Sequence, residues 1–230
     1  PYPGKNISVQ EFQSIVNNLI QFKSSFKKGY VKHDGLAKRI FKTFFGNESS
    51  LSYFKAKKSS STNQLLIKDP FLLFSSKELC LNHKVIICYR PLLPLAASFK
   101  RMKWDFKEFE DLINFFPPNS IKSYRFKASD KISSNVIGAI QFYELFYHYI
   151  KNINPNKNLY FFSQQEFSTD PIEEITNVLK WLELEVSDEI IELSQSLNKG
   201  KSSQIHIPDK SIQHDPNYNK KYSNEYYKLV

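Results

Sequence analysis

The chain has 230 residues, of which 41% are hydrophobic and 15% are aromatic, and it carries a net charge of +9. This size supports one sizeable core, and no apolar run reaches the roughly 18 residues that a transmembrane helix needs. The positive charge fits nucleic acid, an acidic surface or an anionic small ligand. The lysines are spread along the chain, so charge alone identifies no partner.

The first residues, PYPGKNISVQEF, contain no apolar signal-peptide segment and no initiator methionine, from which we expect a fragment or a processed form. The two cysteines, Cys80 and Cys88, predict buried thiols in a reducing, cytoplasmic compartment rather than a disulfide. Because the five histidines are scattered and no Cys/His cluster exists, we expect no metal site.

The first 63 residues form the predicted helical N-terminal part. The predicted elements are a helix over residues 9–28, a second helix over 35–45 and a polar loop over 49–63. Ser8 predicts the N-cap of the first helix, and Glu11 completes a capping box. His33 precedes the second helix, and we favour a solvated loop position for it over a catalytic one.

Three short apolar runs predict buried strands of a parallel sheet: residues 65–67, 85–88 and 158–162. The first two are joined by a predicted helical crossover over 71–81, which gives a βαβ unit. Lys68 ends the first strand and Arg90 ends the second, and Ser98 follows in a helix that begins at Leu95. Ligands bind at this edge of open α/β sheets, so Arg90 and Ser98 can grip one phosphate.

The rest of the chain alternates helices and loops. The predicted helices cover residues 95–104, 106–116, 135–150, 172–184 and 188–197, with a polar loop over 119–134 and a polar tail over 201–230. Asp170 and Pro171 predict an N-cap and a first helical position. The aromatic residues of the 135–150 helix predict core packing rather than a platform for stacked bases. The basic loop Lys199-Gly200-Lys201 can close over an anion, or Gly200 can simply end a helix.

These motifs, in this order, resemble the sulfotransferases that use 3′-phosphoadenosine 5′-phosphosulfate, especially the bacterial, carbohydrate and tyrosyl-protein branches. The motifs are Lys68-Asp69-Pro70, Arg90 with Ser98 eight residues later, and residues 164–167 followed by Asp170-Pro171. The resemblance covers about residues 64–200. It implies one α/β domain over 1–230, three-layered, with a central mainly parallel sheet flanked by helices as in P-loop proteins.

The resemblance also implies the site. Arg90 and Ser98 correspond to the residues that bind the 3′-phosphate, and Lys68 to a lysine near the transferred sulfuryl group. The loop Lys199-Gly200-Lys201 corresponds to one that closes over the 3′-phosphate. The implied reaction transfers a sulfuryl group to a hydroxyl or amine acceptor without a metal.

The sequence departs from the family at several positions. The family usually has a proline two residues after the arginine and an aspartate four residues after it, but here Pro91 follows Arg90 directly and Pro94 occupies the aspartate position. Gln164-Gln165-Glu166 replaces a Tyr-Glu-Asp motif. The family's 5′-phosphosulfate loop is absent, so that either Lys5 is a relic of it or the chain begins after it. Pro70 stands where some members have a histidine. The general base is therefore not assigned: the candidates are Asp69, Glu166, His33 and a residue of the absent segment.

Two alternatives remain at this point. A basic nucleic-acid-binding module explains the charge, and a catalytically degenerate nucleotide-binding domain explains the altered motifs. A nucleotide-dependent kinase needs a Walker loop, Gly-x-x-x-x-Gly-Lys-Ser/Thr, which the sequence does not contain. We expect a sulfate-acceptor substrate as the partner, and no nucleic acid.

Overall fold

The computed structural model describes residues 7–24, 36, 48–59, 65–68, 70–106, 109–113, 126–129 and 132–198. Contacts divide the chain into two compact units, residues 1–79 and residues 80–230. The predicted single domain over residues 1–230 stays a prediction. Of the predicted helix over 35–45, the described residues include only Leu36.

Helix α1, Val9–Ile20, opens the first unit, and its start confirms the predicted capping box. The Ser8 hydroxyl accepts the N–H of Glu11 at 3.1 Å, which satisfies one of the donors left over at a helix start. Phe12, one turn further, is 2% exposed. The helix ends at Ile20 rather than at residue 28, because Phe22 takes a left-handed conformation, φ +55°, that α-helix cannot continue.

Helix α3, Glu48–Lys58, occupies most of the segment predicted as a polar loop over 49–63, so that prediction was wrong. Tyr53 explains the difference. Its side chain is 8% exposed, its ring lies 5.2 Å from that of Phe22, and its hydroxyl accepts the N–H of Ser24 at 3.1 Å. A tertiary contact therefore favours helix where local composition favours a loop.

Residues 65–68 form no strand, so the predicted buried strand over 65–67 was also wrong. Leu66 is 86% exposed, and in the described part of the chain no strand pairs with this segment. A short apolar run without a pairing partner leaves its backbone to water, and hydrophobicity alone does not make it a strand. The next segment is helical as predicted, with η1 over Pro70–Ser75 and α4 over Ser76–Leu79.

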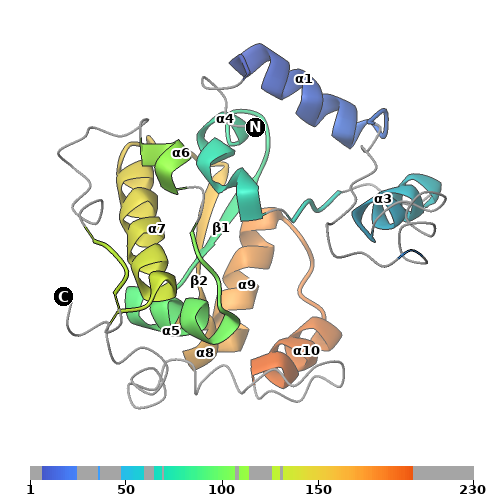
Figure 1. Cartoon of the computed structure of the whole chain (residues 1–230). Coiled ribbons are helices and arrows are strands. Elements are labelled where there is room, and N and C mark those ends of the chain that lie inside the picture. Colours follow the sequence, from blue (N-terminus) through green and yellow to red (C-terminus); the bar gives the residue numbers. More distant parts are fainter. Residues whose placement is uncertain are drawn as a thin grey trace. The chain divides into compact units, whose positions relative to one another are not determined.

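The second unit is built on two parallel strands, β1, Val85–Tyr89, and β2, Leu159–Ser163, which confirm two predicted strands. Helices α7, Ser134–Lys151, and α9, Pro171–Leu182, lie on opposite sides of this pair (Figure 1). The mixed α/β class is thus confirmed. In β1, Ile87 is buried, but Cys88 is exposed and corrects the prediction of a buried thiol.

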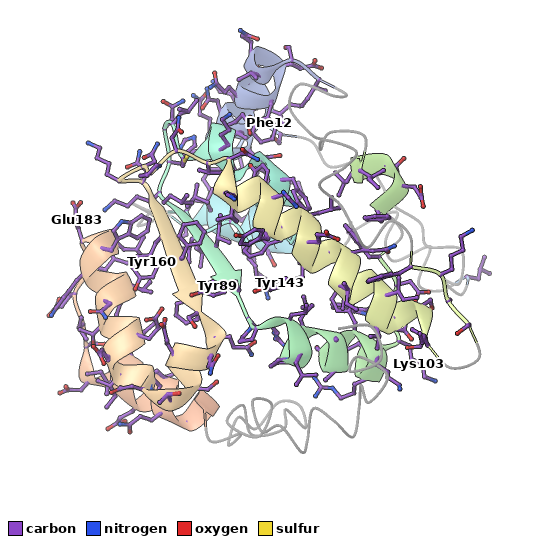
Figure 2. The ribbon with its side chains drawn as sticks, turned by 90° about the vertical axis from the view of Figure 1, so that its left-hand side faces the viewer. Phe12, Tyr89, Lys103, Tyr143, Tyr160 and Glu183 are labelled. Atoms are coloured by element: carbon purple, nitrogen blue, oxygen red, sulfur yellow. The ribbon has the colours of Figure 1, made fainter. Side chains whose placement is uncertain are left out.

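Helix α9 packs on β2 through aromatic side chains. The ring of Tyr160 lies 5.4 Å from that of Trp181, on the side of β2 that faces α9 (Figure 2). The Asp170 carboxylate accepts the N–H of Glu173 at 2.9 Å, and Pro171 opens the helix, as predicted. The short helix α8, Gln164–Thr169, was not predicted, and α10, Asp188–Asn198, agrees closely with its prediction.

Helix α5, Leu92–Met102, packs against α7 through apolar residues. The buried members of this cluster are Ala96, Val136, Ala139 and Ile140. Phe142 contacts Phe99 and Phe106, as core packing predicts, whereas Tyr147 is 55% exposed and corrects that prediction. Helix α6, Phe109–Ile113, lies within the predicted helix over 106–116. The packing of α5 on α7 therefore positions the segment that follows β1.

Candidate anion-binding site at the end of β1

Strands β1 and β2 end at the same edge of the sheet, because Tyr89 pairs with Ser163. The next residues, Arg90 and Gln164, start the connections to α5 and α8. Ligands of parallel sheets bind at this carboxyl-terminal edge, where helices begin and present N–H groups. The structure places Arg90 directly after a strand, as the sequence predicts.

The Arg90 side chain is half-buried and its surroundings disfavour its charge. Burial, and then the charge of Arg101, lower the pKa of the Arg90 guanidinium. Within the described ranges, no carboxylate forms an ion pair with Arg90. Because arginine stays protonated in proteins, an anion bound here would offset this unfavourable placement.

Helix α5 begins at Leu92, earlier than the predicted Leu95, with Pro91 as an N-cap that has no side-chain cap hydrogen bond. Its first internal bond runs from the N–H of Leu95 to the carbonyl of Pro91 at 3.1 Å. Pro94 is tolerated because it lies in the first turn, where N–H groups have no internal acceptor. The N–H groups of Leu92 and Leu93 are the donors that this turn presents beside Arg90.

Ser98 lies on the second turn of α5, and its side chain is half-buried. Among the described residues no hydrogen bond joins its hydroxyl to Arg90. A phosphate accepts hydrogen bonds from both a guanidinium and a hydroxyl.

Lys68 is exposed and follows a segment without a strand. It belongs to the unit over residues 1–79, whereas Arg90 belongs to the unit over residues 80–230, so their predicted proximity stays a prediction. Other predicted site residues lie outside the described part: Lys5, His33, Asp69, Lys199, Gly200 and Lys201. Of the candidate bases, Glu166 is described, and it is exposed on α8.

Glu174, in the first turn of α9, is a functional candidate that the sequence prediction missed. It is 8% exposed, and its Oε1 atom has no hydrogen-bond partner. Burial, together with the charges of Glu166 and Glu173, raises the pKa of Glu174. One signal was present, because Glu174 precedes the buried Val178 by one helical turn.

A cavity of about 240 Å³ lies at the start of α7, where Asp105 and Phe106 follow α5. The Asp105 carboxylate accepts the Ser134 hydroxyl at 2.8 Å and the Asn135 side-chain amide at 2.7 Å. This cavity lies at the end of α5 away from Arg90, and a carboxylate in its wall repels anions. It is therefore separate from the site at the end of β1.

The described residues contain no group of three or more His, Cys, Asp or Glu side chains arranged to hold a metal ion. None of the helices that the structure describes is long and apolar enough to cross a membrane.

Comparison with known proteins identifies no relative: no protein-family model, no curated protein and no solved structure matches this chain. The function is therefore inferred from the residues at the sheet edge.

Proposed function

We propose that this protein is a sulfotransferase, which moves a sulfuryl group from 3′-phosphoadenosine 5′-phosphosulfate to a hydroxyl or amine acceptor. The observation that carries this proposal is Arg90, a half-buried cation at the carboxyl end of a parallel strand with no carboxylate partner among the described residues. Ser98, eight positions later, has the spacing of the family that the sequence resembles. The helices on both sides of β1 and β2 fit the three-layer, P-loop-like fold of that family.

The reaction needs positioning more than covalent chemistry from the protein. The acceptor oxygen or nitrogen forms a bond to sulfur, the bond from sulfur to the 5′-phosphate oxygen breaks, and a base takes the acceptor proton. Arg90 and Ser98 hold the 3′-phosphate as a handle away from the sulfur. From the resemblance of the sequence alone, we assign Lys68 to the leaving 5′-phosphate and the Lys199-Gly200-Lys201 loop to the 3′-phosphate.

We place the reaction in the cytoplasm on the basis of the two thiols. Cys80 is buried and Cys88 is exposed, and they do not form a disulfide. An exposed thiol such as Cys88 persists where the glutathione pool keeps cysteines reduced.

The test is a calorimetric titration with 3′-phosphoadenosine 5′-phosphate and with adenosine 5′-phosphate, which lacks the 3′-phosphate. The wild type should prefer the first nucleotide, and Arg90→Ala should weaken its binding by about 10- to 100-fold, the range for hydrogen bonds to charged groups. Lys180→Ala removes an exposed cation from the last turn of α9 and should leave the affinity unchanged. Absence of binding, or equal binding by wild type and Arg90→Ala, contradicts the proposal.

Two outcomes favour the alternatives. Tight binding of single- or double-stranded nucleic acid that falls steeply with salt, without preference for the 3′-phosphorylated nucleotide, indicates a nucleic-acid-binding module. Nucleotide binding that depends on Arg90, without transfer to any of a panel of hydroxyl and amine acceptors, indicates a catalytically degenerate domain.

A further inference from the structure

The cavity at the start of α7 is a second candidate site. Lys103, labelled in Figure 2, marks the end of α5, and Asp105 and Phe106 follow it into the cavity wall. The cavity measures about 240 Å³. Because an apolar cavity of ~150 Å³ can bind benzene, this one has room for a single ring with a short head group. It is smaller than the roughly 300 Å³ at which pockets for larger ligands begin.

One part of the cavity wall is apolar and held in place. Phe106, Ile137 and Ala128 contribute to it. The Phe106 ring lies edge-on to that of Phe142 at 5.2 Å and 6.2 Å from that of Phe109, so neighbouring rings fix its orientation. An aromatic ring or short hydrocarbon chain is the kind of group that packs on such a wall.

The approach of the Phe106 backbone to α7 depends on Gly138. A Cβ atom at this position would lie 2.8 Å from the Phe106 nitrogen, closer than such atoms normally come. Glycine inside a helix is unfavourable relative to alanine, but here it provides the space that the neighbouring backbone needs. The position of Phe106, and of Asp105 directly before it, is therefore built into α7.

The polar part of the wall contains the Asp105 carboxylate. Its Oδ1 atom accepts the Ser134 hydroxyl at 2.8 Å and the Asn135 side-chain amide at 2.7 Å, and these two bonds orient the carboxylate. Both bonds end on Oδ1, and from the described ranges neither a hydrogen bond nor an ion pair reaches Oδ2. Both donors are neutral, so the charge of Asp105 has no counter-ion among these residues.

A structural role accounts for only part of this arrangement. Ser133, the N-cap of α7, makes no side-chain cap hydrogen bond, and Asp105 ties the start of this helix to the end of α5 in its place. That role uses one of the two carboxylate oxygens. The helix start contributes about half a positive charge, which does not balance a full negative one, so the polar part of the cavity stays net negative.

We propose that this cavity binds a small aromatic amine, with the protonated amino group on Oδ2 of Asp105 and the ring against Phe106 and Ile137. An ammonium group supplies both a hydrogen bond and a counter-charge to the carboxylate. A neutral alcohol supplies only the hydrogen bond, and an anion is repelled. The inference is independent of the proposed function, because the cavity shares no residue with the site at Arg90 and Ser98.

The test is a titration with three probes of similar size: benzylamine, benzyl alcohol and benzoate. Chemical shifts of the backbone amides of Phe106 and Gly138 report binding. Benzylamine should bind with a Kd of about 0.1 to 1 mM, as suits a ligand of about eight non-hydrogen atoms. Because Asp105 is exposed, benzyl alcohol should bind only about three- to tenfold more weakly, and benzoate should not bind measurably.

Two variants test the role of the carboxylate. Asp105→Asn keeps an acceptor for Ser134 and removes the charge, so it should abolish the preference for benzylamine over benzyl alcohol. Glu110→Gln, which removes an exposed carboxylate from α6, is the matched control and should leave that preference unchanged. Both variants should bind 3′-phosphoadenosine 5′-phosphate as the wild type does.

Thermal unfolding checks that each variant folds. If Asp105→Asn does not fold, Ala128→Leu replaces it, because this change narrows the cavity and keeps the carboxylate, and it should weaken benzylamine and benzyl alcohol alike. The proposal is overturned if benzylamine leaves the amides of Phe106 and Gly138 unmoved. It is also overturned if Asp105→Asn keeps the wild-type preference, or if Ala128→Leu binds both probes as the wild type does.

Discussion

A cation flanks each end of strand β1, and the two cations differ in the groups that surround them. At the start of the strand, Lys84 donates to the Trp181 carbonyl and to the Glu183 carboxylate, both at 2.8 Å, and lies 5.5 Å from the Trp181 ring. At the other end, Arg90 is half-buried, has Arg101 as its charged neighbour and has no carboxylate partner among the described residues. Lys84, whose partners belong to the protein itself, connects the start of β1 to the end of α9. Arg90, which has no such partner in the described part of the chain, is suited to bind an external anion.

The largest effect is expected from reversing the charge at each end of β1, because only Arg90→Glu should change the affinity for the nucleotide. Arg90→Glu should weaken binding of 3′-phosphoadenosine 5′-phosphate by about 100-fold or more, because it removes a charged hydrogen bond and adds repulsion. Lys84→Glu should lower the melting temperature by placing a carboxylate beside Glu183, but leave the affinity within about twofold. Calorimetry on both variants measures the contrast. An equal loss of affinity would mean that overall positive charge, not the site at Arg90, binds the nucleotide.

The elements of this sheet and the helix caps were predictable because their causes are local. Val85–Cys88 is a β-branched run followed by a proline-rich break, and the cap at Asp170 depends on residues within one helical turn. The failures have non-local causes. The segment at 65–67 lacks the pairing partner that a strand needs, and α3 is favoured by the contacts of Tyr53.

The residues of the candidate site also differ in how well the sequence predicted them. Arg90 and Ser98 could be found by their spacing around a strand-to-helix turn. Glu174 could not, because its importance lies in its burial and in the charges of its neighbours, among them Glu166 on another helix. A sequence pattern records which residues share a helix face, but not which charged group from another element lies opposite them.

The next largest effect is expected from Glu174, which lies at the same edge of the sheet as Arg90, and it is an effect on stability. Because its folded-state pKa is raised, the folded chain holds the proton more tightly, and stability falls as pH rises above the ordinary value of 4.5 toward the raised one. Glu174→Gln removes the charge and keeps the size and shape of the side chain. It should stabilise the protein at pH 8 by on the order of 1 kcal/mol, as expected for relief of a buried unsatisfied group, and not at pH 4.

Urea unfolding of Glu174→Gln and wild type across this pH range measures the difference. Glu173→Gln, on the exposed side of the same turn, is the matched control and should change the free energy of unfolding by less. A gain that is constant with pH would contradict a carboxyl that titrates in this buried position.

Glycine substitutions at two helix ends should have a smaller effect on the stability of the protein. Lys103, after α5, and Glu183, after α9, both have left-handed backbone, with φ of +54° and +63°, and lie at the ends of these helices in Figure 2. Lys103→Gly should stabilise the protein by about 0.5 kcal/mol or more through relief of this conformation. Glu183→Gly gains the same relief but loses the partner of Lys84, so its net gain should be smaller. Equal gains in urea unfolding would show that the pair at the start of β1 contributes nothing.

The smallest effect is expected from removing the charge of Glu183. The pKa of Glu183 is shifted in the direction opposite to that of Glu174, so stability changes with pH in the opposite sense. The hydrogen bond from Lys84, and then its charge, lower the pKa of Glu183, so its stabilising contribution is present above pH 4.5 and is lost as pH falls through the lowered value. Glu183→Gln should therefore be slightly less stable than wild type at pH 7 and equal to it in strong acid. Because Glu183 is exposed, about 1 M salt should remove most of the difference, while the Glu174→Gln difference should persist. If both differences respond equally to salt, the contrast between the two ends of the sheet does not arise from burial.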